Sequence, residues 1–140
     1  MTIAVTLFIA SSLDGYIAHE DGGIKWLFHD EDYGYTPFLE TVDTVIMGRT
    51  TFEESLKLQE TYPYEGKRTI VYSKAPEDHE HPKATFTDRS PALLLHELDD
   101  QGANHVWLVG GSQLIGSFLE ARLIDEFVIS VHPILLGEGI

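Results

Sequence analysis

The residues best suited to chemistry follow an apolar run near the C-terminal end of the sequence. Gly110 and Gly111 come directly after residues 106–109, and Ser112, a good helix N-cap, opens an amphipathic segment. Adjacent glycines let the chain turn sharply and let another molecule approach the backbone closely. A helix that begins behind such a turn presents free N–H groups and the positive end of its dipole. This stretch therefore predicts a binding site for an anion.

Two further candidates for binding an anion follow earlier apolar runs. The first is Gly48-Arg49-Thr50, where an arginine at a helix start opposes the helix dipole and so needs another reason to be there. A phosphate held bidentately is one such reason, and an exposed ion pair with a glutamate is the alternative. The second is Ser73-Lys74, which would add a hydroxyl and a cation, although by itself this pair is more typical of an ordinary polar turn.

These residues need a sheet that brings the ends of their strands together. Strands are expected at residues 2–10, 44–47, 68–72, 106–109 and 126–132, with a short edge strand at 84–86, and helices at 37–41, 52–58, 91–101 and 112–119. Such alternation predicts βαβ units and a largely parallel sheet, with ligands bound at the carboxyl ends of the strands. Both glycine turns lie at strand carboxyl ends, so we expect them to line one cleft.

Local signals set the expected starts of the helices. Thr36 and Ser90 each precede a proline, the pattern of an N-cap followed by proline at the first helical position. The capping-box spacing Thr-x-x-Glu begins at both Thr50 and Thr51, so the second helix is expected to start at about Phe52.

Composition excludes several classes of function. The 140 residues fit a single domain, and the absence of cysteine excludes disulfides and thiolate metal sites. A net charge of −14 makes nucleic acid and anionic membranes poor partners. There is no basic leader and no apolar run of the ~20 residues that a membrane span needs, so a cytoplasmic location is expected. The pair His79 and His81 has no third ligand in view, and no metal site is expected.

Two sets of motifs resemble known reductases. Residues 45–53 (VIMGRTTFE) and 109–114 (VGGSQL) are similar to the two cofactor motifs of dihydrofolate reductase. Residues 12–18 (SLDGYIA), with the ending 123–126 and 133–139, are instead similar to the reductase domain of the bifunctional riboflavin-biosynthesis deaminase/reductase. The combination resembles the small bacterial proteins of the dihydrofolate reductase family and covers essentially the whole chain. It implies an α/β, dihydrofolate-reductase-like three-layer fold, a mostly parallel central sheet flanked by helices.

The resemblance also bears on how far the domain extends and on its partners. It implies that residues 1–140 form one domain that lacks the family's C-terminal sheet hairpin. It further implies a homodimer, because relatives often dimerise, and a small molecule as the substrate.

The resemblance implies NADPH as the cofactor. The implied contacts are Ala10, Ile17, Gly48, Arg49, Thr50, Ser73, Lys74, Gly110, Gly111, Ser112, Gln113 and Leu114. Ala10 and Ile17 would flank the nicotinamide, while Arg49 and Thr50 would meet phosphates. Residues 73–74 would lie near the 2′-phosphate, and residues 110–114 would cradle the pyrophosphate. The peptide between the two glycines is expected to be cis.

The implied reaction is hydride transfer from NADPH to a C=N or C=O bond of a small pterin- or pyrimidine-like heterocycle. It would be related to that of the 5-amino-6-(5-phosphoribosylamino)uracil reductase of riboflavin biosynthesis. The chain departs from that enzyme at Tyr16 and at residues 48–50, which puts a phosphoribosyl substrate in question. The alternatives are dihydrofolate reductase proper and a non-catalytic protein that binds or senses NADPH.

Two carboxylates are the candidate catalytic residues. Asp14 would orient substrate or relay a proton, or else it forms an Asx turn with Gly15. Dihydrofolate reductases place a carboxylate on their first helix after a tryptophan, and Asp32, or its neighbour Asp30, would take that role after Trp26. A solvated acidic loop is the alternative interpretation of this run.

Overall fold

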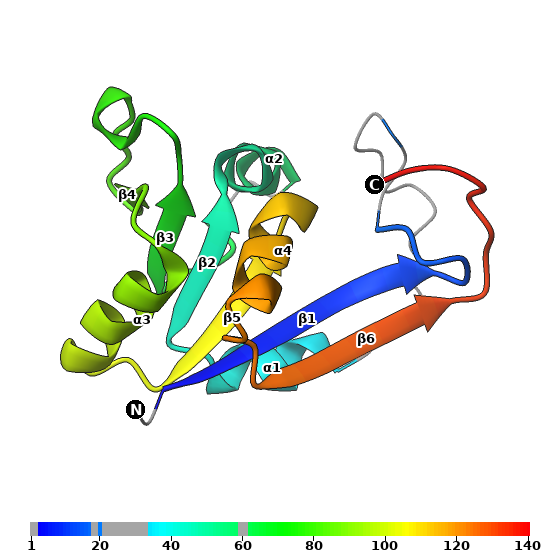
Figure 1. Cartoon of the computed structure of the whole chain (residues 1–140), viewed down its shortest axis with the longest axis horizontal. Coiled ribbons are helices and arrows are strands. Elements are labelled where there is room, and N and C mark those ends of the chain that lie inside the picture. The colour runs from blue at the N-terminus through cyan, green and yellow to red at the C-terminus, as the bar shows by residue number, and fades with distance from the viewer. Residues whose placement is uncertain (1–2, 18–19, 21–33, 59–61) are drawn as a thin grey trace.

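A computed structural model of the chain describes residues 3–17, 20, 34–58 and 62–140. Within these ranges strands and helices alternate as the sequence predicts (Figure 1). In chain order they are β1 (Ala4–Ser12), α1 (Tyr35–Thr41), β2 (Thr44–Gly48), α2 (Arg49–Leu58), β3 (Arg68–Tyr72), the 3-10 helix η1 (Pro76–Asp78), β4 (Thr85–Thr87), α3 (Pro91–Asp100), β5 (His105–Gly110), α4 (Ser112–Glu120) and β6 (Glu126–His132).

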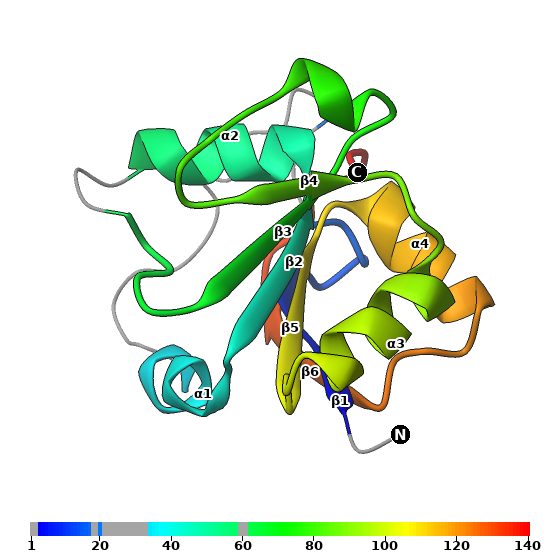
Figure 2. The ribbon, with the colours of Figure 1, turned by 90° about the vertical axis from the view of Figure 1, so that its left-hand side faces the viewer.

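The strands form one sheet in the order β4-β3-β2-β5-β1-β6, and every pairing between these strands is parallel. Figure 2 shows α1 and α2 on one face of the sheet and α3 and α4 on the other. The expected three-layer α/β fold with a mostly parallel sheet is confirmed.

The chain reverses its direction across the sheet between β2 and β5. From β2 the chain passes through α2 to β3, whereas from β5 it passes through α4 across to β6. Crossovers between parallel strands are right-handed, so opposite directions place α2 and α4 on opposite faces. Such a reversal between neighbouring strands opens a crevice at their carboxyl ends, where ligands of α/β proteins bind.

Two hydrophobic clusters, one on each face, fix the sheet between its helices. The α3–α4 side contains Leu95, Leu98 and Phe118, each at most 2% exposed. Full burial of a side chain of this size contributes about 1.5–3 kcal/mol. On the α1–α2 side, Phe8 stacks on Phe38 with ring centroids 4.4 Å apart, and the Trp107 indole Nε1 donates to the Phe8 carbonyl at 3.1 Å. Both clusters therefore pack against strands whose carboxyl ends lie at the crevice.

Two predicted helix starts are wrong. α1 begins at Tyr35 after Gly34, which has φ 82° and caps without a side chain, so Thr36 lies inside the helix. Pro37 is tolerated there because the N–H groups of the whole first turn lack intrahelical partners. α2 begins at Arg49 because β2 runs directly into it, and this places Thr50 and Thr51 in helical positions, where neither is an N-cap.

Of the remaining two predicted helix caps, one is confirmed and one is wrong. The cap at Ser90 is confirmed, since its Oγ accepts from the Leu93 N–H at 3.3 Å with Pro91 as the first helical residue. Ser112, expected to cap α4, is instead its first residue, because the extended Gly111 occupies the N-cap position.

The amino ends of the strands are joined by aspartates that carry no sequence motif. Asp43 Oδ2 accepts from the N–H groups of Asn104 and His105 at 2.8 and 3.1 Å, and Asp125 Oδ2 accepts from Val5 N at 2.8 Å. These carboxylates therefore fix the register at the end of the sheet opposite the glycine turns. No helix in the described part of the chain has the length and apolar character needed to cross a membrane.

Candidate functional site

The two glycine turns lie against one another. Gly48 ends β2 and Gly110 ends the neighbouring β5, next to a register shift in the pairing of these strands. A Cβ atom added at Gly48 would lie 3.8 Å from Gly111 N and 3.9 Å from Gly110 O. A side chain at Gly48 would therefore lie between the two turns. Because glycine has none, no side chain of residue 48 covers the backbone of the turns.

Two helix N-termini converge on this space. The Gly110–Gly111 peptide is cis, as the resemblance implied, and Gly111 caps α4 without a side-chain hydrogen bond. α2 starts directly after Gly48, and a Cβ at Gly111 would meet Thr51 Oγ1 at 3.7 Å. Each terminus offers backbone N–H groups and the positive end of a dipole, so the crevice favours an anion.

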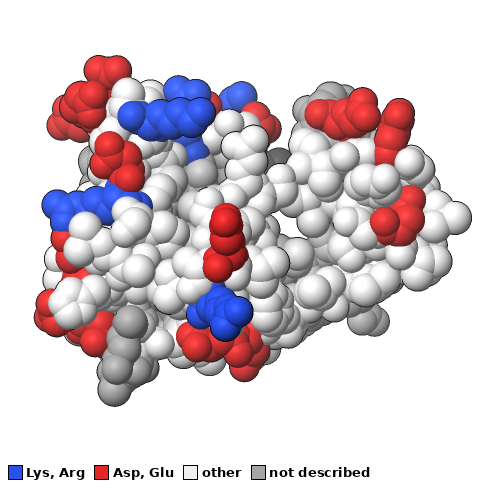
Figure 3. Space-filling view, viewed as in Figure 1, with Lys and Arg blue, Asp and Glu red and all other residues white. Residues whose placement is uncertain are grey.

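The predicted cations stand beside this crevice and are exposed. Within the described residues, neither Arg49 nor Lys74 forms an ion pair. Figure 3 shows Lys and Arg side chains along the upper edge of the molecule, where β2 and β3 end. Ser73 is partly engaged already, because its Oγ accepts from Ala75 N at 3.2 Å and its N–H donates to the Thr87 carbonyl.

Sequence reasoning did not single out Tyr72, the last residue of β3. Its ring packs edge-on against Phe118 with centroids 6.3 Å apart. The hydroxyl oxygen is buried and has no hydrogen-bond partner among the described residues. Burial raises the pKa of Tyr72 to about 12, because the charged tyrosinate is disfavoured away from water. A tyrosine at a strand end carries no motif, so only the packing reveals this unpaired group.

The remaining predicted residues lie around the end of β1 or outside the described part. Ala10 lies in β1 opposite Ser130, and the Ile17 N–H donates to the Ile140 carbonyl at 2.7 Å. Asp14 follows β1 and is exposed, with its carboxylate bonded to residues of the C-terminal segment. Asp32 and its acidic neighbours lie outside the described residues.

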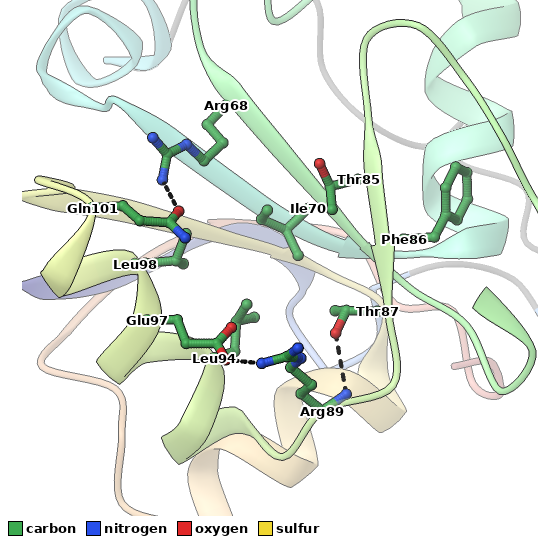
Figure 4. A pocket seen from close by; sticks show the side chains of 10 residues that line it. All are labelled: Arg68, Ile70, Thr85, Phe86, Thr87, Arg89, Leu94, Glu97, Leu98 and Gln101. Carbon is green, nitrogen blue, oxygen red and sulfur yellow. Dashed lines mark hydrogen bonds and ion pairs between the residues drawn. The ribbon is translucent and has the colours of Figure 1, made fainter. Parts of the chain in front are cut away.

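A separate groove of about 360 Å³ lies between β3, β4 and α3 (Figure 4). Arg68 Nη1 donates to Gln101 Oε1 at 2.6 Å on one wall, and Arg89 pairs with Glu97 on the other. Both arginines therefore already have partners, and none of the predicted cofactor residues lines the groove.

The architecture is that of dihydrofolate reductase. The enzyme from Enterococcus faecalis, in a complex with NADP(H), superposes with a TM-score of 0.71 at 20% identity, covering 98% of this chain and 74% of that one. An identity this low shows the shared fold alone.

The chain belongs to the family of the RibD C-terminal domain, whose family model matches residues 4–140. The YwjB protein of Bacillus subtilis (strain 168), itself uncharacterised, is 41% identical over 137 residues, which cover 96% of this chain and 79% of YwjB. The Thermotoga maritima diaminohydroxyphosphoribosylaminopyrimidine deaminase/5-amino-6-(5-phosphoribosylamino)uracil reductase superposes with a TM-score of 0.77 at 23% identity, covering 99% of this chain and 47% of that one. The chain is thus a relative of riboflavin-biosynthesis reductases.

Proposed function

We propose that this protein is an NADPH-dependent reductase. It transfers hydride to a C=N or C=O bond of a small pterin- or pyrimidine-like heterocycle. The observation that carries the proposal is the meeting of two glycine turns and two helix N-termini at the carboxyl ends of β2 and β5. That crevice suits the pyrophosphate of a dinucleotide, because it offers N–H donors and its turns are built from glycines, which have no side chain of their own to block close approach.

The residues around the crevice fit NADPH in their chemistry. Residues 110–114 would supply backbone donors for the pyrophosphate. Arg49 and Thr50 open α2 directly after Gly48 and would meet the cofactor's phosphates, Arg49 the 2′-phosphate among them. Lys74 and Ser73 follow the adjacent strand and suit the 2′-phosphate. A fold relative that holds NADP(H) supports the same choice of cofactor. The bound cofactor would supply the hydride. The protein would bind the cofactor, orient it and exclude water.

Two measurements test the proposal. Saturable quenching of protein fluorescence by NADPH in the micromolar range is the expected binding result. NADPH absorbance is then followed with 5-amino-6-(5-phosphoribosylamino)uracil and, separately, with dihydrofolate. Oxidation with the first compound supports the proposed substrate class, and oxidation with dihydrofolate alone would make the protein a dihydrofolate reductase. Absence of NADPH binding would refute the proposal.

A second candidate is a protein that binds NADPH without turning it over. It is favoured by Asp14, whose carboxylate is already engaged by hydroxyl and amide donors. NADPH binding with no oxidation of either compound would establish this candidate over the reductase.

A further inference from the structure

The segment after β6, residues 133–140, folds back onto the loop after β1, residues 13–17. We name these the strap and the β1 loop. Figure 1 shows the strap returning from the end of β6 toward the loop that follows β1. Leu13 N donates to the Ile134 carbonyl at 2.8 Å, and Ile17 N donates to the Ile140 carbonyl at 2.7 Å. The strap thus contacts both ends of the β1 loop.

Asp14 accepts the other hydrogen bonds between the described residues of these two segments. Its Oδ1 accepts from Leu136 N at 3.2 Å and its Oδ2 accepts from Gly137 N at 2.8 Å. Oδ1 also accepts from the hydroxyl of Ser12 at 2.5 Å, and the buried Ser12 oxygen in turn accepts from Tyr16 N at 3.0 Å. Asp14 therefore joins the end of β1 to the strap through one carboxylate.

These donors favour the charged form of the carboxyl. The Ser12 hydroxyl is the largest influence, and with the amides of Gly137 and Leu136 it lowers the pKa of Asp14 below its ordinary 3.8 against a smaller opposing effect of desolvation. At neutral pH the carboxylate is ionised with both oxygens accepting hydrogen bonds. An ionised carboxylate can hold the loop by accepting hydrogen bonds, but it has no proton to donate.

We propose that Asp14 is a positioning residue that holds the strap against the β1 loop and thereby fixes Ile17, the residue that the resemblance implies beside the nicotinamide. The hydrogen bonds are present in the structure, whereas the expected effect on nicotinamide binding rests on the proposed function. Within the described residues, Asp14 accepts two of the four hydrogen bonds between strap and loop. Without them, the hydrogen bonds at Ile134 and Ile140 would be the remaining ones between the strap and the β1 loop in the described part of the chain.

The first test concerns the strap alone. Asp14→Asn keeps the shape of the side chain but removes the charge and one acceptor. We expect the amides of Leu136 and Gly137 to exchange hydrogen roughly tenfold faster or more, since their acceptor is weakened. Glu138→Gln is the matched control, because it also removes one negative charge, from an exposed side chain of the strap itself. Unchanged exchange at both amides in Asp14→Asn would overturn the proposal.

The second test separates the nicotinamide end from the phosphates. Affinities are measured for NADPH and for 2′-phospho-ADP-ribose, which lacks the nicotinamide. In Asp14→Asn we expect NADPH to bind about tenfold more weakly, with 2′-phospho-ADP-ribose changed by less than about twofold. Glu138→Gln should change neither affinity.

Two other results of the second test would count against the inference. Equal weakening of both ligands would show that Asp14 does not act at the nicotinamide end. If the unmodified protein binds neither ligand, the proposed function fails, and with it the role of Asp14 in nicotinamide binding. Hydrogen exchange at Leu136 and Gly137 then decides by itself whether Asp14 holds the strap. Circular dichroism confirms that each variant is folded, and Ser12→Ala provides a second variant that removes the hydroxyl bonded to Asp14.

Discussion

Under the proposed function, single side chains beside the crevice would decide between NADPH and NADH. NADPH differs from NADH by one phosphate, and a charged donor aimed at that group discriminates between the two. Arg49 and Lys74 are exposed cations next to the strand ends, without ion-pair partners in the part of the chain that the structure describes. Their charges are therefore available to a ligand.

Replacing Arg49 with alanine is expected to weaken NADPH far more than NADH. A hydrogen bond to a charged group contributes about 1.5–3 kcal/mol, which corresponds to roughly ten- to hundredfold in affinity. Fluorescence titration with both nucleotides measures the difference. Arg122→Ala is the control, since this exposed arginine follows the opposite end of α4. Equal losses for NADPH and NADH would move Arg49 from the 2′-phosphate to the shared phosphates.

The Tyr72 hydroxyl gives a second prediction for a single residue. Because it is buried and unpaired within the described residues, Tyr72→Phe should leave the free energy of unfolding unchanged or raise it by about 1 kcal/mol. Tyr64→Phe is the matched control: that hydroxyl lies 3.1 Å from Ser55 Oγ, so its loss should destabilise by about 1 kcal/mol. Urea unfolding compares the two variants. A clear destabilisation by Tyr72→Phe would show that its hydroxyl has a partner.

The same burial makes a prediction about pH. The neutral tyrosine is favoured in the folded state, so its contribution to stability is complete below the ordinary pKa near 10 and is lost as pH rises toward about 12. In an alkaline absorbance titration of the folded protein, we expect a tyrosinate step at about 12. That step should disappear in Tyr72→Phe, and its persistence would assign it to another tyrosine.

At the scale of elements, the relation between β2 and β5 creates the crevice. Apolar runs and turn residues were sufficient to predict the strands, the parallel sheet and the two glycine turns at one edge. Helix starts were predicted less well, because direct continuity from β2 into α2 overrides a local capping signal. The bond between Asp14 and Gly137 was beyond sequence reasoning, since it joins residues 123 positions apart and the motifs that contain them do not indicate the pairing.

A methyl group added at Gly48 should narrow the crevice without disturbing the fold. In Gly48→Ala the added Cβ meets only ordinary contacts at 3.8 Å or more, so stability should change little. The methyl group occupies the space between the turns, and we expect NADPH affinity to fall at least about tenfold. Gly116→Ala is the control within α4, because its Cβ meets nothing within 4 Å and should stabilise the helix by about 0.5–1 kcal/mol with unchanged binding. Unchanged NADPH affinity in Gly48→Ala would place the cofactor elsewhere.

At the scale of the whole molecule, the acidic surface opposes folding. Charges of one sign repel each other when the chain compacts, and the net charge here is −14. The ion pairs between described residues are all on the surface, where each contributes about 0–1 kcal/mol. The expected homodimer stays a prediction, which sedimentation equilibrium would test.

Added salt should therefore stabilise the protein. Raising sodium chloride from about 0.05 M to about 0.5 M shortens the screening length and weakens the repulsion more than it weakens exposed ion pairs. We expect the urea midpoint to rise, with the same increase in potassium chloride. A midpoint that falls with both salts would show that attractive pairs outweigh the repulsion.

The position of β1 between β5 and β6 has a consequence for how the protein is made. Synthesis proceeds from the N-terminus, so this apolar strand leaves the ribosome before β2, β3 and β4, and both of its partners follow those strands. Pairing across almost the whole chain is slow, because a long loop must close before any contact compensates for the lost entropy. Until β5 has been made, the nascent chain carries an unpaired apolar strand, the kind of segment that chaperones shield from aggregation.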